Sequence, residues 1–379
     1  MKHSKKVLFV VNDSAFFLSH RLAIALSAKA EGYDVHVATA PGVASEEISG
    51  LGLSYHPIEL TRSGINPIAQ LKSLISIYRL FNQLQPDLVH LVTIKPVLYG
   101  GLIARILKTR AVVAAISGLG SVFIAKTKLR RILRYLVLKI YRLSLGHKNI
   151  SVIFQNPDDR NILLSANIVK EDNAIMIRGS GVDLSLYPFN EEPCGTPIVV
   201  MAARLLKEKG VLVFVEAARI IKSKGIDARF LLVGAPDPGN PSSVTQAEVE
   251  AWVNNGVVEA LGFRRDIPHV FAEANIVVLP SFYGEGLPKV LIEAAACGRP
   301  VVTTDNPGCR DAIEPDVTGL LVPPKDPQML AYAIERLIFD PSLRIKMGKA
   351  GRRLAEKEFR IESVVDTHLS IYERLLKDW

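Results

Sequence analysis

The chain has 379 residues, a length typical of two domains. Half of the residues are hydrophobic and 22% are charged, which excludes a disordered chain, and no apolar run approaches the roughly 18 residues that a membrane span needs. The first apolar run, residues 7–11, is too short for a signal-peptide core. Three scattered cysteines without a CxxC pair argue against a disulfide scaffold or a structural zinc site and fit a reducing cytosol.

Charge is divided unevenly along the chain. Residues 1–190 contain 23 Lys and Arg against 12 Asp and Glu, whereas residues 191–379 contain 23 against 26. Residues 101–150 alone hold eleven basic residues and no acidic one. This asymmetry indicates either that the N-terminal half faces an anionic partner, such as a membrane, a nucleic acid or a phosphorylated substrate, or that it has an uneven solvated face.

The first half of the chain alternates predicted strands with predicted helices. A continuous apolar run predicts a strand that is buried on both faces at residues 6–11, and further strands are predicted at 34–39, 53–58, 87–92, 111–116, 150–154 and 174–177. Helical periodicity and capping residues predict helices at about 16–30, after 66–67, and at 97–107, 127–145 and 157–165. This order implies a mostly parallel sheet with helices on both faces.

A segment with three prolines, residues 186–197, breaks this rhythm and is predicted to be a linker. Strands are predicted again at 198–203, 228–233, 256–261, 275–279, 300–303 and 319–322, with helices between them and over the last 50 residues. The sequence therefore predicts an α/β protein of two doubly wound, Rossmann-like domains, 1–188 and 189–360, that face each other across a cleft. Ligands of such sheets bind outside the carboxyl ends of the strands.

Two cations stand in the first strand-to-helix turn of the second domain. Arg204 and Lys209 follow the predicted strand 198–203 and precede a predicted helix. The N-terminus of that helix adds partial positive charge and free N–H donors, so the turn suits a diphosphate. The alternative is a pair of solvated cations beside a loop.

Two carboxylates flank a later helix start. Glu285 lies on a glycine-rich turn after the predicted strand 275–279, and Glu293 follows eight residues later on an apolar helix. Backbone N–H groups near Gly286 and Leu287 can meet phosphates. A nucleotide sugar, with hydroxyls at both ends and phosphates between, matches this pattern. The plainer interpretation, one acid in a turn and one on a helix, leaves Glu293 as a buried acid without a role.

The spacing of these four residues resembles the retaining glycosyltransferases of family 4, which have the GT-B fold. The resemblance implies that Arg204 and Lys209 bind the donor diphosphate and that Glu293 holds the ribose hydroxyls. It also implies that Glu285 lies beside the sugar hydroxyls as the catalytic carboxylate. The resemblance covers essentially the whole chain and is most specific over residues 198–322.

Further stretches extend this resemblance. Residues 261–266, with Phe263 and Arg264, resemble the turn that contacts the nucleotide base, and residues 181–183 resemble the motif before the inter-domain hinge. The family also implies that the final helix, 361–379, crosses back onto the N-terminal domain.

The N-terminal domain carries the acceptor in this family. Many members have a histidine in the stretch that matches residues 117–121, and this chain has none there. That stretch and residues 12–21 are instead similar to the undecaprenyl-diphosphate-linked amino-sugar α-1,3-N-acetylgalactosaminyltransferases. Candidates for acceptor or phosphate contacts are Gly118, Gly120, Ser121 and His20, with His90 as a further alternative to the missing histidine.

The helix predicted at 126–148 is strongly basic. A helical wheel places Leu129, Ile132, Leu133, Leu136, Ile140 and Leu143 on the face toward the core. The opposite face mixes cations with apolar and aromatic residues, as an anionic membrane interface favours, and its predicted membrane-facing residues are Arg130, Arg131, Arg134, Tyr135, Leu138 and Tyr141. A solvated basic face is the alternative.

Together with these patterns, the resemblance implies a hexosyltransferase that moves an N-acetylhexosamine from a UDP-sugar to a polyprenyl-diphosphate-linked saccharide in surface polysaccharide or glycan assembly. It would be cytoplasmic and peripheral on the inner face of an anionic cell membrane. No cofactor, metal or nucleic-acid partner is expected, since no Asp-x-Asp motif is present and paired carboxylates would repel nucleic-acid phosphates. The alternatives are a UDP-sugar 2-epimerase of the same fold and a glycosyltransferase with a soluble acceptor.

Overall fold

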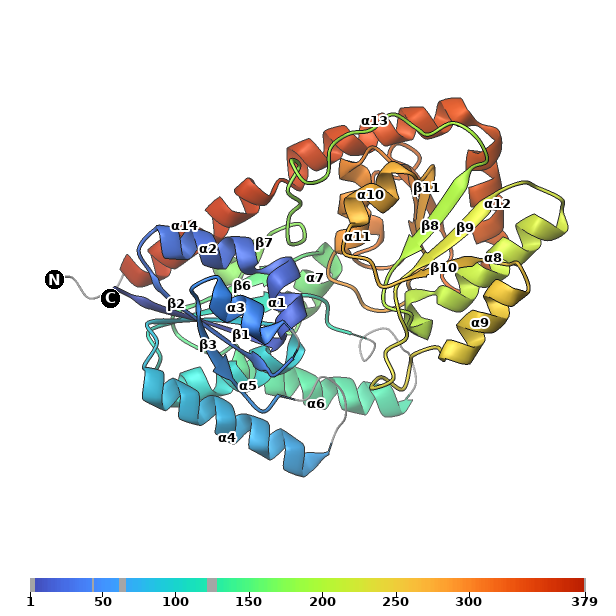
Figure 1. Cartoon of the computed structure of the whole chain (residues 1–379). Coiled ribbons are helices and arrows are strands. Elements are labelled where there is room, and N and C mark those ends of the chain that lie inside the picture. The colour runs from blue at the N-terminus through green and yellow to red at the C-terminus, as the bar shows by residue number, and fades with distance from the viewer. Residues whose placement is uncertain (1–3, 43, 61–65, 121–127, 378–379) are drawn as a thin grey trace. The chain divides into compact units, whose positions relative to one another are not determined.

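The predicted strands pair in parallel in a computed structural model, which describes residues 4–42, 44–60, 66–120 and 128–377 and leaves out the side chains of 128–133. The chain divides into unit 1, residues 1–180 and 361–379, and unit 2, residues 181–360. Each unit is an α/β structure built around one parallel sheet (Figure 1). The α/β fold with two doubly wound parallel sheets is as the sequence predicted.

Unit 1 contains a seven-stranded sheet in the order β3-β2-β1-β4-β5-β6-β7. Its strands are β1 (Lys6–Asp13), β2 (Asp34–Ala40), β3 (Ser54–Pro57), β4 (Leu88–Val92), β5 (Ala111–Ile116), β6 (Ile150–Phe154) and β7 (Ala174–Met176). Its helices are α1 (Ser14–His20), α2 (Leu22–Ala30), α3 (Ser45–Gly50), α4 (Pro67–Leu84), α5 (Ile94–Ile106), α6 (Lys128–Ser144), α7 (Pro157–Ser165) and α14 (Ile361–Lys377), with a 3-10 turn η2 (Glu171–Asn173).

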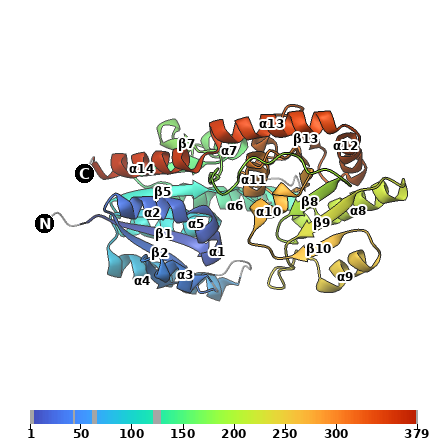
Figure 2. The ribbon, with the colours of Figure 1, turned by 45° about the horizontal axis from the view of Figure 1, so that its top comes forward.

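Alternating side chains of β1 point to two separate cores in unit 1. Val7 and Phe9 pack with α1, α2 and α14, whereas Leu8 and Val10 pack with α4, α5, α6 and α7. The final helix α14 lies beside α2, as both views show (Figures 1 and 2). The last helix of the chain is thus part of the N-terminal unit.

One predicted helix is broken in two. Residues 16–30 were expected to form a single helix, but α1 ends at His20 and α2 begins at Leu22. Arg21 between them has φ −132°, outside the helical region, and its side chain is only 2% exposed. The inward turn of Arg21 is therefore the local feature that divides the helix.

Unit 2 contains a six-stranded sheet in the order β10-β9-β8-β11-β12-β13. Its strands are β8 (Ile198–Ala202), β9 (Arg229–Val233), β10 (Glu259–Gly262), β11 (Ile276–Leu279), β12 (Val301–Thr304) and β13 (Gly319–Val322). Its helices are α8 (Val211–Ser223), α9 (Gln246–Asn254), α10 (Ile267–Ala272), α11 (Lys289–Ala296), α12 (Pro327–Phe339) and α13 (Pro341–Glu358), with 3-10 turns η3 (Lys207–Lys209) and η4 (Arg310–Ala312).

No helix in the described parts of the chain is both long enough and apolar enough to cross a membrane.

Candidate functional site

The strand order of unit 2 reverses between β8 and β11. From β8 the chain proceeds outward to β9 and β10, and it then returns to β11 on the other side of β8. The crevice at such a reversal, outside the carboxyl ends of the strands, is where doubly wound sheets bind ligands. Lys209 follows β8 and Glu285 follows β11, so the topology brings these two predicted residues to the reversal.

Lys209 and Glu285 form an ion pair at this point. Lys209 Nζ lies 2.6 Å from Glu285 Oε1, and the two side chains are only 18% and 11% exposed. The Ser281 hydroxyl donates a hydrogen bond to the same carboxylate oxygen at 2.8 Å. Charge-assisted contacts of this kind fix both geometry and orientation, so the Glu285 carboxylate is held firmly at the end of β11.

Two glycines allow the neighbouring loops to approach this pair. A Cβ on Gly210, which has φ +84°, would lie 2.1 Å from the carbonyl oxygen of Pro280. A Cβ on Gly308, which has φ +82°, would lie 2.1 Å from the carbonyl oxygen of Gly286. Both positions therefore require glycine, and the loops after β8, β11 and β12 pack against one another because of it.

Glu293 lies on α11 among apolar neighbours and is 8% exposed. Its Oε1 accepts a hydrogen bond from the Tyr187 hydroxyl at 2.7 Å and lies 3.5 Å from Lys289 Nζ, one helical turn away. Burial and the nearby carboxylate raise the pKa of Tyr187 well above its ordinary value, so this hydroxyl remains a donor at physiological pH. Glu293, the buried acid that the sequence predicted, is thus hydrogen-bonded to Tyr187, for which the sequence predicted no role.

Most of the other predicted donor-site side chains are more exposed. The Arg204 side chain is 52% exposed and lies 3.6 Å from an Asp237 carboxylate oxygen. Phe263 is 72% exposed, and the neighbouring Arg264 donates from Nε to Asp266 at 2.7 Å. Leu287 is buried, and Gly286 forms the close contact with Gly308. The side chains of Arg204, Phe263 and Arg264 thus lie exposed on loops beyond the strands, where a ligand can reach them, whereas that of Leu287 does not.

A buried thiol beside the pair is not a nucleophile. Burial, with the Glu285 charge nearby, raises the pKa of Cys309 to about 12, so the thiol stays neutral at pH 7. Among the residues that the structure describes, no group of three or more His, Cys, Asp or Glu side chains could hold a metal ion.

Unit 1 also reverses its strand order, between β1 and β4. Gly118 and Gly120, after β5, have φ +102° and +76°, a left-handed backbone that needs glycine. His20, at the end of α1, stacks on Phe16 with ring centres 4.0 Å apart, and its Nδ1 lies 2.7 Å from Ser19 Oγ. Ser121, the fourth acceptor candidate, lies outside the described residues.

Three polar residues at the same edge of unit 1 were not anticipated. Asn12 Oδ1, Thr93 Oγ1 and Ser117 Oγ are buried and have no hydrogen-bond partner in the described parts of the chain. They lie at the carboxyl ends of the adjacent strands β1, β4 and β5. Thr93 also has φ +73°, a strained conformation for a β-branched residue and one that often marks a functional site. Single polar residues after strands are too common for sequence to reveal this group.

His90 cannot replace the missing family histidine at the surface. Its side chain is fully buried in the core beneath α14, where Nδ1 contacts the Tyr372 hydroxyl at 2.5 Å. Its ring also packs against His368, with ring centres 5.4 Å apart. The alternative role of His90 in proton or phosphate contacts is therefore wrong, because the side chain belongs to the interior of unit 1.

The predicted orientation of the basic helix is wrong. Tyr141 of α6, expected to face a membrane, is completely buried in the core of unit 1 that also contains Leu8 and Val10. Leu138 is partly buried against that core. Leu136, Ile140 and Leu143, expected to face the core, are 51%, 44% and 54% exposed. Tyr135 is 58% exposed, as expected, and Arg134 is partly exposed, whereas the side chains of Arg130 and Arg131 lie outside the described residues.

A close contact between two helices explains this orientation. The Ser144 hydroxyl on α6 donates to the Leu98 carbonyl on α5 at 2.6 Å. A Cβ on Gly101 would lie 2.6 Å from the Ser144 carbonyl oxygen, so α5 and α6 touch at the backbone there. This contact turns Tyr141 and Ser144 inward. The helical wheel could not reveal it, because a small polar residue marks the packed face.

Two family models match this chain. One, described as glycosyl transferases group 1, matches residues 188–354, and the other, described as glycosyl transferase 4-like, matches residues 6–156. Among curated relatives, the N,N'-diacetylbacillosaminyl-diphospho-undecaprenol alpha-1,3-N-acetylgalactosaminyltransferase of Campylobacter jejuni is 29% identical and covers 98% of this chain and 100% of its own. The UDP-Gal:alpha-D-GlcNAc-diphosphoundecaprenol alpha-1,3-galactosyltransferase of Escherichia coli is 26% identical, covering 81% of this chain and 80% of its own.

Solved structures show the same fold. A glycosyltransferase from Rickettsia africae matches with a TM-score of 0.79 and 20% identity, covering 100% of both chains. Anabaena HepE in complex with UDP and glucose also gives a TM-score of 0.79 at 20% identity, covering 98% of this chain and 100% of its own. The two family models together cover most of both units. The chain therefore belongs to the group 1 and 4-like glycosyltransferases, and it has their GT-B fold.

Proposed function

We propose that this glycosyltransferase moves an N-acetylhexosamine from a UDP-sugar to a polyprenyl-diphosphate-linked saccharide, with retention of configuration. The proposal rests on two carboxylates of unit 2. Glu285, after β11, forms an ion pair with Lys209, and Glu293, on α11, accepts a hydrogen bond from Tyr187. Two relatives, one from Campylobacter jejuni and one from Escherichia coli, are named for diphosphoundecaprenol-linked substrates and support an acceptor of that class.

The donor would bind along the edge of unit 2. Arg204 and Lys209 would contact the diphosphate, together with backbone N–H groups near Gly286 and Leu287. Glu293 would accept hydrogen bonds from the ribose hydroxyls, and Phe263 and Arg264 would lie by the base. Glu285 would contact the transferred sugar and stabilise the positive charge that develops on its ring during transfer.

The acceptor would bind unit 1 at the carboxyl ends of its strands. Gly118 and Gly120 allow a phosphate to approach the backbone, and Asn12, Thr93 and Ser117 offer buried polar atoms to sugar hydroxyls. In a retaining transfer, the bond between the anomeric carbon and the diphosphate oxygen breaks as the acceptor oxygen bonds to that carbon on the same face. The hydroxyl proton passes to the departing phosphate oxygen, so no additional base is needed.

Two exposed apolar stripes would place unit 1 on a membrane. One stripe is on α6, and the other consists of Ile68, Leu71, Ile75 and Tyr78 on α4, which are 69%, 57%, 40% and 43% exposed. Helix α5 lies between α4 and α6 (Figure 1). Residues 60–157 contain 15 Lys and Arg and a single acidic residue, Asp87. Apolar side chains surrounded by cations favour an anionic lipid surface, the inner face of the cell membrane.

A transfer assay tests the proposed reaction. The purified chain is incubated with UDP-N-acetylhexosamines and other UDP-sugars, with and without a lipid-diphosphate-linked amino sugar. We expect UDP release and an α-linked disaccharide product only when the acceptor is present. Formation of a 2-epimer of the donor sugar without acceptor would replace this proposal with the epimerase alternative, and transfer to water-soluble acceptors alone would remove the lipid-linked acceptor.

A further inference from the structure

Tyr187 lies in the segment that the sequence predicts to be a linker, 106 residues before its partner Glu293. Its hydroxyl donates to Glu293 Oε1 at 2.7 Å. Among the residues that the structure describes, no hydrogen bond to Glu293 Oε2 is found, so that oxygen is available to accept hydrogen bonds from a ligand. The two carboxylate oxygens therefore differ: Oε1 accepts the hydrogen bond from Tyr187, and Oε2 can accept hydrogen bonds from a ligand.

The backbone of Tyr187 is fastened to the helix that carries Glu293. Arg352 on α13 donates from Nη1 to the Tyr187 carbonyl at 2.8 Å and to the Ala296 carbonyl, at the end of α11, also at 2.8 Å. The ring of Phe189 lies against Gly298, where a Cβ would be 2.5 Å from Phe189 Cε2. The segment that contains Tyr187 and Phe189 therefore packs against the C-terminal end of α11.

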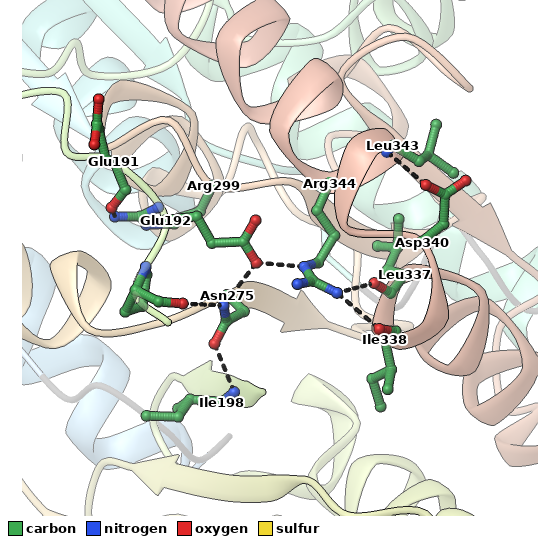
Figure 3. Close-up of polar contacts among 11 residues, drawn as sticks. Glu191, Glu192, Ile198, Asn275, Arg299, Leu337, Ile338, Asp340, Leu343 and Arg344 are labelled. Carbon is green, nitrogen blue, oxygen red and sulfur yellow. Dashed lines mark hydrogen bonds and ion pairs between the residues drawn. The ribbon is translucent and has the colours of Figure 1, made fainter. Parts of the chain in front are cut away.

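A buried polar cluster fixes the continuation of this segment (Figure 3). The Glu192 carboxylate accepts hydrogen bonds from Arg344 Nε and, at 2.6 Å, from Asn275 Nδ2. Arg344 Nη1 also donates to the carbonyls of Leu337 and Ile338, and its side chain is only 8% exposed. Such a cluster, with its polar groups paired, holds the chain in one conformation.

Arg299 also forms a hydrogen bond to this segment. Its guanidinium donates to the Glu191 carbonyl at 3.0 Å and to two carbonyls at the end of α10, and the residue is 1% exposed. Residues 187–193 are therefore held along their length by two arginines of α13, by Asn275 just before β11 and by Arg299 shortly after α11. A hydroxyl on so constrained a segment has few positions available, and its partner carboxylate loses rotational freedom as well.

We propose that Tyr187 is a positioning residue for nucleotide recognition, which fixes the Glu293 carboxylate so that its second oxygen meets the ribose hydroxyls of the donor. This inference rests on the proposed ribose contact of Glu293. A carboxylate that is already oriented before the ligand arrives loses less conformational entropy on binding. Tyr187 thereby contributes to donor affinity without touching the donor.

The test compares two nucleotides and three variants by calorimetry. The nucleotides are UDP and 2′,3′-dideoxy-UDP, which lacks both ribose hydroxyls, and the variants are Tyr187→Phe, Glu293→Gln and the double variant. We expect Tyr187→Phe to raise the Kd of UDP about tenfold, the scale of one hydrogen bond to a charged group. The Kd of dideoxy-UDP should stay unchanged, because that ligand makes no contact through Glu293.

Two further readouts separate positioning from a structural role. In turnover with the UDP-sugar, Tyr187→Phe should raise KM and leave kcat unchanged, the pattern of a contact equal in ground and transition states. The double variant should bind UDP no more weakly than Glu293→Gln alone, because both changes act through one carboxylate. Tyr332→Phe, at a 63% exposed position on α12, is the matched control and should change nothing.

Each contrary result has a distinct meaning. If Glu293→Gln weakens UDP binding but Tyr187→Phe does not, the hydroxyl only fastens the segment and the inference is wrong. Equal weakening of both nucleotides by Tyr187→Phe would also overturn it, because the effect would then come from the fold. If Glu293→Gln leaves the Kd of UDP unchanged, the ribose contact of the proposed function fails, and the inference that depends on it fails too.

Discussion

Glu285 and Lys209 form an ion pair, so a substitution at either residue affects both side chains. Removing one partner of a largely buried ion pair leaves the other uncompensated, which costs stability as well as any ligand contact. Lys209→Ala would therefore combine a lost diphosphate contact with a displaced Glu285 carboxylate. Arg204, with its half-exposed side chain, is the better residue for isolating the diphosphate contact.

The two carboxylates should differ in kinetic effect. Glu285→Gln keeps the size of the side chain and removes its charge, so we expect kcat to fall by about 10²–10³-fold, as when one electrostatic contact to a transition state is lost. Glu293→Gln should mainly raise KM for the donor. Steady-state kinetics measure both, with Glu216→Gln, at a 47% exposed side chain, as control. Unchanged turnover in folded Glu285→Gln would remove Glu285 from the reaction.

Arg204→Ala should weaken binding of UDP far more than binding of uridine. One charge-assisted contact is worth about 1.5–3 kcal/mol, and uridine has no phosphate to make it. Thermal stability should hardly change, since the Arg204–Asp237 pair is half-exposed and exposed pairs contribute little. Calorimetry with both ligands tests this, with Arg219→Ala on α8 as the matched surface control. An equal loss for UDP and uridine would place Arg204 away from the diphosphate.

At the scale of elements, α14 closes a buried polar cluster over unit 1. Arg21, His90, His368 and Tyr372 are each at most 2% exposed. Burial, and then the charge of Arg21, lowers the pKa of His368 to about 3. His368 Nδ1 donates to the Val364 carbonyl at 2.7 Å, and the neutral ring is therefore the native form. Protonation of His90 or His368 would add a second charge beside a buried guanidinium.

Unit 1 should consequently lose stability in acid. The folded pKa of His368 lies below its unfolded value of about 6.5, so as pH falls between 6.5 and 3 only the unfolded state takes up the proton. At pH 5 this amounts to about 2 kcal/mol for His368. Urea unfolding at pH 7 and pH 5 measures it. His368→Gln should shrink the difference by about that amount, and His269→Gln, at an exposed side chain, should not. An unchanged difference in His368→Gln would contradict this assignment.

The exposed apolar face of α6 should bind anionic vesicles. Replacing Leu136 and Ile140 by Gln removes two half-exposed apolar side chains, which should cost about 2 kcal/mol of membrane affinity, or roughly 30-fold in partitioning. The fold should survive, because neither side chain is packed in the core. Vesicle sedimentation at low and high salt is the measurement, since salt screens the basic residues and leaves the apolar contribution.

The matched control for α6 lies in unit 2. Leu212 and Met329 are 42% and 43% exposed on α8 and α12, and their double replacement by Gln should leave sedimentation unchanged. If the α6 variant sediments with anionic vesicles as well as the parent chain does, this face does not contact lipid. Transfer to a short water-soluble acceptor analogue should persist in either case.

At the scale of the whole molecule, the donor and the acceptor are proposed to use different units. A saturating nucleotide should therefore stabilise unit 2 alone. At 100 times its Kd, UDP adds about 2.7 kcal/mol to the unit that binds it, a rise in melting temperature of about 5–10 °C for a unit of this size. Calorimetry should show one transition that moves with UDP and another that does not.

The pH dependence of unit 1 identifies the two transitions. The transition that weakens between pH 7 and pH 5, and does so less in His368→Gln, belongs to unit 1. UDP should leave that transition in place, and Arg204→Ala should reduce the shift of the other. A single transition that moves as a whole would show that the units unfold together, contrary to this prediction.

Features that depend on local pattern could be predicted from the amino-acid sequence. Apolar runs such as Val7–Val11 identify buried strands because neighbouring residues of a parallel strand are covered on both faces. The order of strands and helices predicts two doubly wound sheets, and these bring the turns after β8 and β11 together. Arg204, Lys209, Glu285 and Glu293 could accordingly be chosen as candidate donor-site residues from their positions in these turns together with the resemblance to family 4 glycosyltransferases.

The partner of each charged group and the packed face of each helix depend instead on contacts between residues far apart in the chain. Glu293 meets Tyr187 across 106 residues, and no local spacing encodes such a contact. Helix α6 turns Tyr141 inward because Ser144 meets α5 at Gly101. Periodicity defines a stripe along a helix, but the shape of the neighbouring element determines which stripe is buried, and backbone contact outweighed hydrophobicity here.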